Sequence, residues 1–329
     1  MNSPQQAFRY PDRRMFVTAL ASAAMARRVA AQGRRRIVLA TAGQGGAFPA
    51  FGKAVAAMMT RHAHFDIELR ETKGSNENAD LIEAGEVPFA CINMGPAFDA
   101  WKGNPPFAGR HLRGLRALVP MYETPFHTIA ARRRGIATLS DLDGKRVGVG
   151  PAGGPGDVMF GRLADALGIR ATLVTGSPSE MGAMVLREDI DAFWYGSGLP
   201  SPPFTEVAQQ IDADVIGFTP GEAAAFRGIF TYFAPFEIAA DTYRGQTRPI
   251  ASLAVWNFVV AAEGAAPDLA YELTTALIEH ADEVKVSFPA AASMIAANVT
   301  ANTFMPFHPG AVRYYRESGV TLPKELVPG

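Results

Sequence analysis

Short apolar runs alternate with segments of helical periodicity along most of this chain, beginning near residue 36. The runs are short and bounded by glycine, proline or small polar residues, which suits strands buried in a parallel sheet. We expect strands at residues 37–40, 65–69, 89–92, 146–150, 171–174, 192–195 and 215–218. We expect helices at residues 51–61, 75–83 and 158–167. Strands and helices in this order predict an α/β fold with parallel sheets.

The strand–helix plan restarts in the middle of the chain, which indicates two Rossmann-like lobes. At 329 residues the chain exceeds one typical core and suits two lobes of roughly 150 residues each. Strands predicted at 115–120 and 128–131 would bracket a first crossover between the lobes, and the apolar run 250–262 would make the return crossing. Helices predicted at 269–280 and 282–298 would then rejoin the first lobe.

These crossings divide the chain into three predicted parts. Residues 1–31 precede the fold, residues 32–120 together with 255–329 form lobe I, and residues 121–254 form lobe II. Two lobes joined by crossing strands can close over a ligand that lies between them. The sequence contains no tandem repeat and no low-complexity segment.

The first 31 residues resemble a twin-arginine (Tat) export signal. Arg13 and Arg14 precede an uncharged stretch at 15–25, which is too short to span a bilayer but long enough for the apolar part of a signal peptide. The small residues at 29–31 then offer a cleavage site. We therefore predict export to the periplasm; an uncleaved anchor or a disordered tail is the alternative.

Removal of this leader changes the charge of the protein. The leader contains five arginines and one aspartate, so it leaves 26 of the 31 basic and 31 of the 32 acidic residues, a net charge of −5 against −1 for the whole chain. An acidic mature protein is a poor match for nucleic acid or anionic lipid, and we predict neither as a partner.

Two glycine-rich turns, at residues 41–48 and 150–157, each join a strand to a helix. In this position backbone N–H groups at a helix N-terminus can approach a ligand. The first turn is not a dinucleotide fingerprint, because the third glycine of GxGxxG would fall on Phe48, and it lacks the GK(S/T) ending of a P-loop. If the lobes pair, the two turns face each other across a cleft; tight turns without a ligand role remain the alternative.

Three polar residues near helix starts have two possible roles. Ser75 and Asn78 occupy positions where they would cap the helix that begins near residue 75, and small polar residues of this kind also bind polar solutes in clefts. Asp157 would either cap the helix that follows the second turn or point a carboxylate into the cleft. A carboxylate in the cleft would repel an anionic ligand.

Patterns for catalysis or metal binding are weak. The six histidines show no HExxH or similar spacing, and Gly196-Ser197-Gly198 lacks the GxSxG elbow of a hydrolase. Cys91 is the only cysteine, which excludes an internal disulfide, and its apolar neighbours predict a place in the core. We therefore predict a non-enzymatic protein without a metal or cofactor.

Five segments together resemble one family. TAGQGGAF, GSNEN, GKRVGVGPAGGPG, DAFWYGSGLP and FHPGAVRYYRESG occur between residues 41 and 319 in the order seen in the TAXI family, the extracytoplasmic solute receptors of TRAP transporters. The resemblance implies a type II periplasmic-binding-protein fold, a monomer that closes over an amino acid or organic acid, and a TRAP membrane subunit as partner. It also implies that the cleft is formed by Gly43, Gln44, Gly46, Phe48, Ser75, Asn78, Asn93, Gly154, Gly156, Asp157, Trp194, Tyr195 and Ser197.

Two departures from the family pattern affect the expected ligand. Phe48 and Pro49 replace a pair of tyrosines, which removes two hydroxyls, and Pro155 and Asp157 stand in the second turn where the family has GSGT. Proline donates no backbone hydrogen bond, and an unpaired carboxylate opposes a bound anion. We therefore expect a solute that is less anionic than glutamate, or one that carries an ammonium or hydroxyl donor. A sensor that reports occupancy to another partner, or an enzyme on a similar fold, are the alternatives to a transport receptor.

Overall fold

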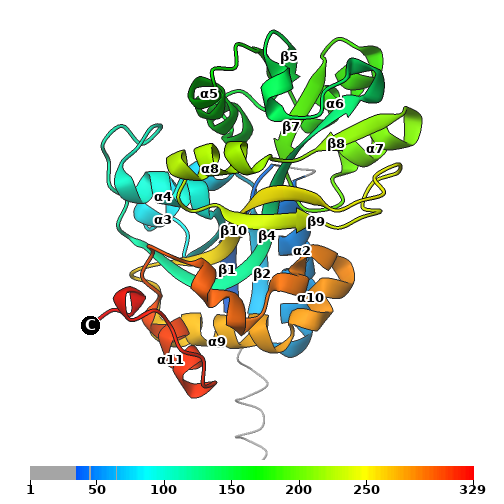
Figure 1. The fold of residues 1–329 in the computed structure, drawn as a ribbon. Helices are drawn as coiled ribbons and strands as arrows, with labels where there is room; N and C mark the ends of the chain where they lie inside the picture. The colour runs from blue at the N-terminus through cyan, green and yellow to red at the C-terminus, as the bar shows by residue number, and fades with distance from the viewer. Residues whose placement is uncertain (1–34, 44–45, 64) are drawn as a thin grey trace, which may run out of the picture.

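The computed structural model describes residues 35–43, 46–63 and 65–329, so the leader predicted at residues 1–31 lies outside the described chain. The described strands form one ten-stranded mixed sheet in the order β2-β1-β3-β10-β4-β7-β5-β6, with β8 beside β4 and β9 beside β10. Figure 1 shows helices gathered around each end of this sheet. None of the described helices has both the length and the apolar character that a bilayer crossing requires.

The N-terminal half of the sheet follows the sequence prediction closely. Strands β1 (Arg35–Ala40), β2 (Phe65–Arg70) and β3 (Phe89–Asn93) are parallel, with β1 in the middle. Strand β3 is buried along its whole length, as expected for a central strand with helices on both sides. The helices that follow these strands are α2 (Ala47–His62), α3 (Ser75–Glu83) and α4 (Met94–Lys102); the last was not predicted.

Between residues 146 and 229 the second half contains four short strands and four α-helices. Its strands are β5 (Arg146–Gly148), β6 (Thr172–Val174), β7 (Ala192–Gly196) and β8 (Ala213–Ile216). Its helices are α5 (Pro155–Leu167), α6 (Pro178–Arg187), α7 (Pro202–Gln210) and α8 (Pro220–Ile229). Each helix begins with proline, whose fixed φ suits the first helical position and whose missing N–H is not needed there. Helices α6, α7 and α8 were not predicted from the sequence.

Two long antiparallel strands run through both halves. Strand β4 (Leu115–Ala131) pairs with β10 (Ile250–Ala262) over its first part and with β7 and β8 over its last part, while β9 (Ala234–Ile238) pairs with the start of β10. The β4–β10 register shifts twice, between Asn257 and Phe258 and between Val259 and Val260. Such bulges bend a strand pair without interrupting it.

The prediction of two separate strands at 115–120 and 128–131 was wrong, because β4 continues through residues 121–127. This continuous strand contains Pro120 and Pro125, although proline cannot donate to a sheet. Over Leu115 to Pro125, however, β4 has only β10 as a neighbouring named strand in the described chain, so its other edge tolerates prolines. The predicted lobe boundaries at residues 120 and 254 fall inside β4 and β10.

The C-terminal segment packs against the N-terminal half. It contains α9 (Pro267–Glu279), α10 (Ala281–Ser287) and α11 (Pro309–Glu317). The predicted helix 282–298 was wrong in length: α10 ends at Ser287, because Pro289 lacks the N–H that a helix needs and disfavours helical geometry at Phe288. The Tyr315 hydroxyl donates to the Leu118 carbonyl at 2.8 Å, which fixes α11 against β4.

His127 lies in a small core of the second half that is built around Phe193 and Phe204. Its side chain is 1% exposed, its ring meets Phe204 edge to face, and its Nε2 lies 2.8 Å from the Tyr243 hydroxyl. Burial lowers the pKa of His127 from 6.5 to about 3. The folded protein therefore holds this imidazole neutral, whereas the unfolded chain would protonate it below about pH 6.5.

We predict an acid sensitivity that arises from His127. Because the folded pKa is depressed, stability present above pH 6.5 is lost as the pH falls toward 3, at a rate of about 1.4 kcal/mol per pH unit. Urea unfolding at several pH values between 7.5 and 4.5 measures this slope. The variant His127→Gln, which keeps a polar partner for Tyr243, should show a slope shallower by about that amount. Equal slopes in the two proteins would contradict the prediction.

Candidate ligand-binding site

A groove of about 540 Å³ lies where the two halves of the molecule meet. One wall comes from the start of α3 and from Pro96 of α4, and the other comes from the glycine-rich turn that precedes α5. The lining residues are Lys73, Ser75, Asn76, Glu77, Asp80, Pro96, Pro151, Ala152, Gly153, Gly154 and Pro155. A hollow lined from both halves is the arrangement in which closure of the halves can enclose a solute.

The starts of α3 and α5 share one local design. Gly74 and Gly154 are the N-cap residues, and a carboxylate three positions later accepts from the backbone N–H that precedes the cap. In α3 the Glu77 Oε2 accepts from Lys73 N at 2.8 Å, and in α5 the Asp157 Oδ2 accepts from Gly153 N at 2.9 Å. Both helix N-termini, with their partial positive charge, therefore border the groove, and each carries an acidic side chain that offsets it.

Asp157 therefore closes its own turn with one carboxylate oxygen. The turn is further tightened by a hydrogen bond from Gly154 N to the Pro151 carbonyl at 2.9 Å. Gly156 follows in the first turn of α5, where a Cβ would lie only 2.4 Å from the Val149 carbonyl oxygen. The backbone here leaves no room for a side chain at position 156.

Asn78 lies beneath the groove and is fully buried. Its Nδ2 donates to the Thr41 carbonyl at 2.7 Å and to the Cys91 carbonyl at 2.8 Å, and its Oδ1 accepts from the Thr72 hydroxyl at 2.8 Å. These bonds join the chain just after β1, the loop after β2 and strand β3. The side chain thus holds the carboxyl ends of three strands together, under the start of α3.

Ser75 and Asn93 connect the groove wall to the long strands. The Ser75 Oγ accepts from Asn93 N at 3.0 Å, and the Asn93 Oδ1 accepts from Gly95 N at the start of α4. The Asn93 Nδ2 donates to the Asn257 Oδ1 at 3.2 Å, and Asn257 in turn donates to the Tyr122 carbonyl and the Thr124 hydroxyl. This buried chain of amides links β3, β10 and β4 at the crossing between the halves.

The two aromatic candidates on β7 have different surroundings: Trp194 lies in the core, and Tyr195 lies beside the second glycine turn. Trp194 has no exposed surface and packs on Phe126 and Phe160, so it supports the second half from inside. Tyr195, on the opposite face of the strand, packs against the glycine turn: a Cβ on Gly150 would lie 3.2 Å from its ring. Burial raises the pKa of Tyr195 above its ordinary value. The Ser197 Oγ donates to the Gly198 carbonyl at 3.2 Å.

None of the described residues of the first glycine turn lines the groove. The Gly46 N donates to the Gly43 carbonyl at 3.3 Å, and Phe48 packs against the core. Gln44 lies outside the described residues. The second turn lies across the groove from the start of α3. The expectation that the second turn faces the first turn stays a prediction, because residues 44 and 45 lie outside the described chain.

Of the eleven lining residues, Ser75 and Gly154 were predicted as cleft residues, and the other nine were not. Most of the nine lie within or beside GSNEN and the second glycine turn, so membership of these two segments was the available signal. Asp80 pairs with Arg110 at 2.7 Å, which leaves Lys73 and Glu77 as the charged groups of this wall. Hydrogen-bonding and charged groups in a hollow of this kind suit the binding of a small polar molecule.

Comparisons with known proteins agree with this architecture. A model of the NMT1-like family matches residues 39–319. MatC from Rhodopseudomonas palustris, solved with bound malate, superposes with a TM-score of 0.54 at 12% identity, covering 78% of this chain and 88% of MatC. A TctC solute-binding protein from Polaromonas gives a TM-score of 0.52 at 13% identity, covering 80% of this chain and 88% of that protein. At such identities the likeness shows a shared fold, and it confirms the predicted α/β periplasmic-binding-protein architecture.

Proposed function

The chain belongs to the NMT1-like family, and on this basis we propose that it is a periplasmic solute receptor of a TAXI-type TRAP transporter. The observation that carries the proposal is the groove between the two halves, which takes its walls from α3 and α4 on one side and from the turn before α5 on the other. The five TAXI-like segments support the finer assignment, and the Tat-like leader supports export. In this role the protein is a monomer without a cofactor, and it catalyses no reaction.

The proposed mechanism is closure of the two halves around β4 and β10. The chain passes between the halves along these two strands. The two bulges in their pairing are places where the strand pair can bend. A solute that contacts both walls of the groove binds the closed form more tightly than the open form and so increases its population. The TRAP membrane subunit would then recognise the closed form and release the solute.

The charges of the groove indicate the class of solute. Glu77 and Lys73 line the groove, and the Asp157 carboxylate lies behind the lining residue Gly153, from whose N–H it accepts a hydrogen bond, so two carboxylates stand beside the helix N-termini against one cation. A ligand that carries an ammonium or hydroxyl group together with a carboxylate complements these charges better than a dicarboxylate does. We propose an amino acid or a hydroxylated organic acid.

Neutralising Asp157 should favour dianions. In Asp157→Asn the side-chain oxygen still accepts from Gly153 N, but the negative charge is gone; two like charges about 4 Å apart interact by ~4 kcal/mol at an effective dielectric of ~20, and solvent reduces this in an open groove. We expect malate to bind the variant about tenfold more tightly, as measured by calorimetry. The control Glu206→Gln removes an exposed charge from α7 and should change nothing. If the unaltered protein binds malate tightly and Asp157→Asn binds it with the same affinity, the prediction is contradicted.

Native mass spectrometry of protein purified from its host tests the receptor function directly. A small molecule that co-purifies at one copy per chain, together with compaction in small-angle scattering when it is added back to stripped protein, is the expected result. Chemical turnover of the bound compound would favour the enzyme alternative. An occupancy-dependent complex with a protein other than a TRAP membrane subunit would favour the sensor alternative.

A further inference from the structure

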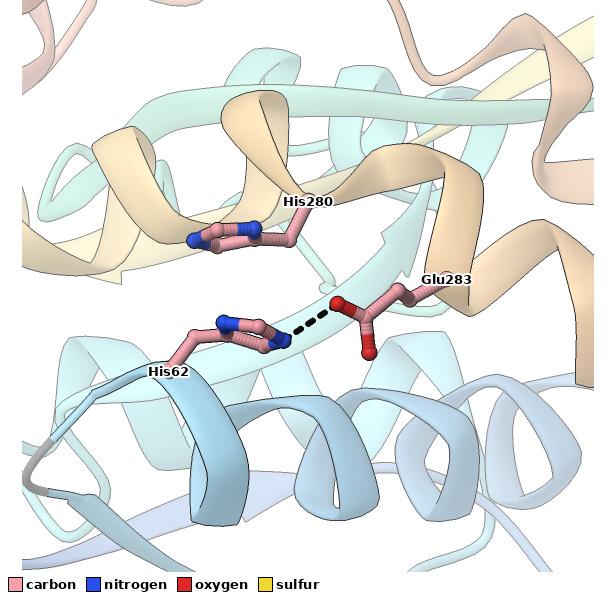
Figure 2. Close-up of side chains that lie close together, drawn as sticks. All are labelled: His62, His280 and Glu283. Atoms are coloured by element: carbon pink, nitrogen blue, oxygen red, sulfur yellow. Dashed lines mark ion pairs between the residues drawn. The ribbon is translucent and has the colours of Figure 1, made fainter.

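Away from the groove, three side chains with metal-binding atoms lie together on the surface of the N-terminal half. Figure 2 shows His62 at the end of α2, His280 between α9 and α10, and Glu283 in the first turn of α10. One nitrogen from each imidazole and one oxygen of the carboxylate all lie within 4.8 Å of one another. The two rings stack with their centroids 4.0 Å apart, and His62 Nε2 pairs with Glu283 Oε1.

The surroundings of the cluster favour a cation. Helix α2 ends at His62 and α9 ends at Glu279, so two helix C-termini, with their partial negative charge, converge on the two imidazoles. Arg61 donates to Glu283 Oε2 at 2.8 and 3.0 Å, which fixes the carboxylate and leaves Oε1 directed toward His62. Among the residues that the structure describes, neither ring nitrogen of His280 has a hydrogen-bond partner.

We propose that His62, His280 and Glu283 bind one divalent transition-metal ion at this surface. Two imidazoles and one carboxylate form a donor set that suits Zn²⁺, and that also suits Ni²⁺ and Cu²⁺, whereas Mg²⁺ and Ca²⁺ prefer oxygen ligands. The ion would join α2 to the α9–α10 junction, two segments more than 200 residues apart in the chain. This site is independent of the solute groove and of the proposed transport role.

Ion binding requires a small rearrangement of the rings. The imidazole planes are only 21° apart, so their in-plane lone pairs do not converge on one point as they stand. Rotation about the terminal torsion of each histidine, which is broad and inexpensive, brings one nitrogen of each ring toward Glu283 Oε1. Arg61 can remain on Oε2 and act as the outer partner that orients the carboxylate. Because Arg61 also places a positive charge nearby, we expect micromolar rather than nanomolar affinity.

Calorimetric titration of the full, tag-free protein with ZnCl₂ tests this site. We expect one Zn²⁺ per chain, a melting midpoint that rises by a few degrees with saturating Zn²⁺, and no heat with MgCl₂ or CaCl₂. His62→Gln, His280→Gln and Glu283→Gln should each weaken Zn²⁺ binding by more than about tenfold, since loss of even an outer partner reaches that range. Glu283→Gln retains a side-chain oxygen that can accept from Arg61. A loss of Zn²⁺ affinity in this variant therefore reports the missing negative charge of the ligand and not a broken contact with Arg61.

His111 provides the matched control, because it is an exposed histidine remote from the cluster in sequence. His111→Gln should bind Zn²⁺ as the unaltered protein does. The proposal is overturned if the unaltered protein shows no Zn²⁺ heat. It is equally overturned if the double variant His62→Gln/His280→Gln keeps the affinity of the unaltered protein, or if His111→Gln loses as much affinity as the cluster variants.

Discussion

Replacing Asn78 by leucine will lower the free energy of unfolding by about 2–4 kcal/mol. Leucine has the same branched heavy-atom skeleton as asparagine, with bulkier methyl groups, but it removes two donated hydrogen bonds, to the Thr41 and Cys91 carbonyls, and one accepted from Thr72. An acceptor left unpaired in a buried site costs about 1–3 kcal/mol, and Cys91 O loses its bond to the amide. Solute affinity will fall as well, because the start of α3 lies directly above this amide.

Asn76→Leu is the matched control for this change. Asn76 lies two positions earlier, at the groove and partly exposed, so the same substitution there should alter stability by less than about 0.5 kcal/mol. Urea unfolding compares both variants with the unaltered protein. If Asn78→Leu were as stable as the unaltered protein but unable to bind solute, Asn78 would be a ligand contact, as the sequence resemblance implies, and not a structural tie.

Replacing Gly156 by alanine will disrupt the second glycine turn. The added Cβ would lie 2.4 Å from the Val149 carbonyl oxygen, and this neighbour is backbone, so either the turn or α5 must move. We expect a loss of about 2–4 kcal/mol in the free energy of unfolding and at least a tenfold loss in solute affinity, because Gly153, Gly154 and Pro155 form one wall of the groove.

Gly161 on the same helix provides the comparison. A Cβ there meets nothing within 4 Å, so Gly161→Ala should stabilise α5 by about 0.5–1 kcal/mol and leave solute binding unchanged. Denaturant unfolding and calorimetry on the two variants separate the local clash from the general effect of glycine replacement in α5. Unchanged stability and affinity in Gly156→Ala would show that the turn adapts freely and would remove its assigned role in shaping the groove.

Most of the strands were predictable because burial imposes a pattern on them, although β9 was not predicted. Residues 250–262 form a long apolar run, and β10 has those bounds. The continuity of β4 through Pro120 and Pro125 was not predictable from the chain alone, because tolerance of proline depends on which edge of the strand has a neighbour. Helix α4 was missed because it is short and follows β3 without a loop.

The candidate groove lies beside segments that the sequence singled out, but the contacts of its residues were not predictable from the sequence. A small polar residue after a strand can face a ligand or the backbone of its own protein, and only the neighbouring elements decide which. Asn78 bonds to three segments that are distant from one another in sequence, and the Asp157 carboxylate closes its own turn. His62 and His280 lie 218 positions apart in the chain, so no spacing rule could bring them together with Glu283.

The continuity of β4 and β10 sets a limit on how this molecule can move. Hinges made of loose loops let domains swivel in many directions, whereas a pair of hydrogen-bonded strands resists twisting and shearing and yields most readily where its ladder is interrupted. The amide chain from Asn93 through Asn257 to Thr124 braces that ladder beside its first irregularity. In the proposed mechanism, opening and closing therefore follow a narrow flexing path, so the faces that the proposed membrane partner would meet before and after solute capture are two defined shapes.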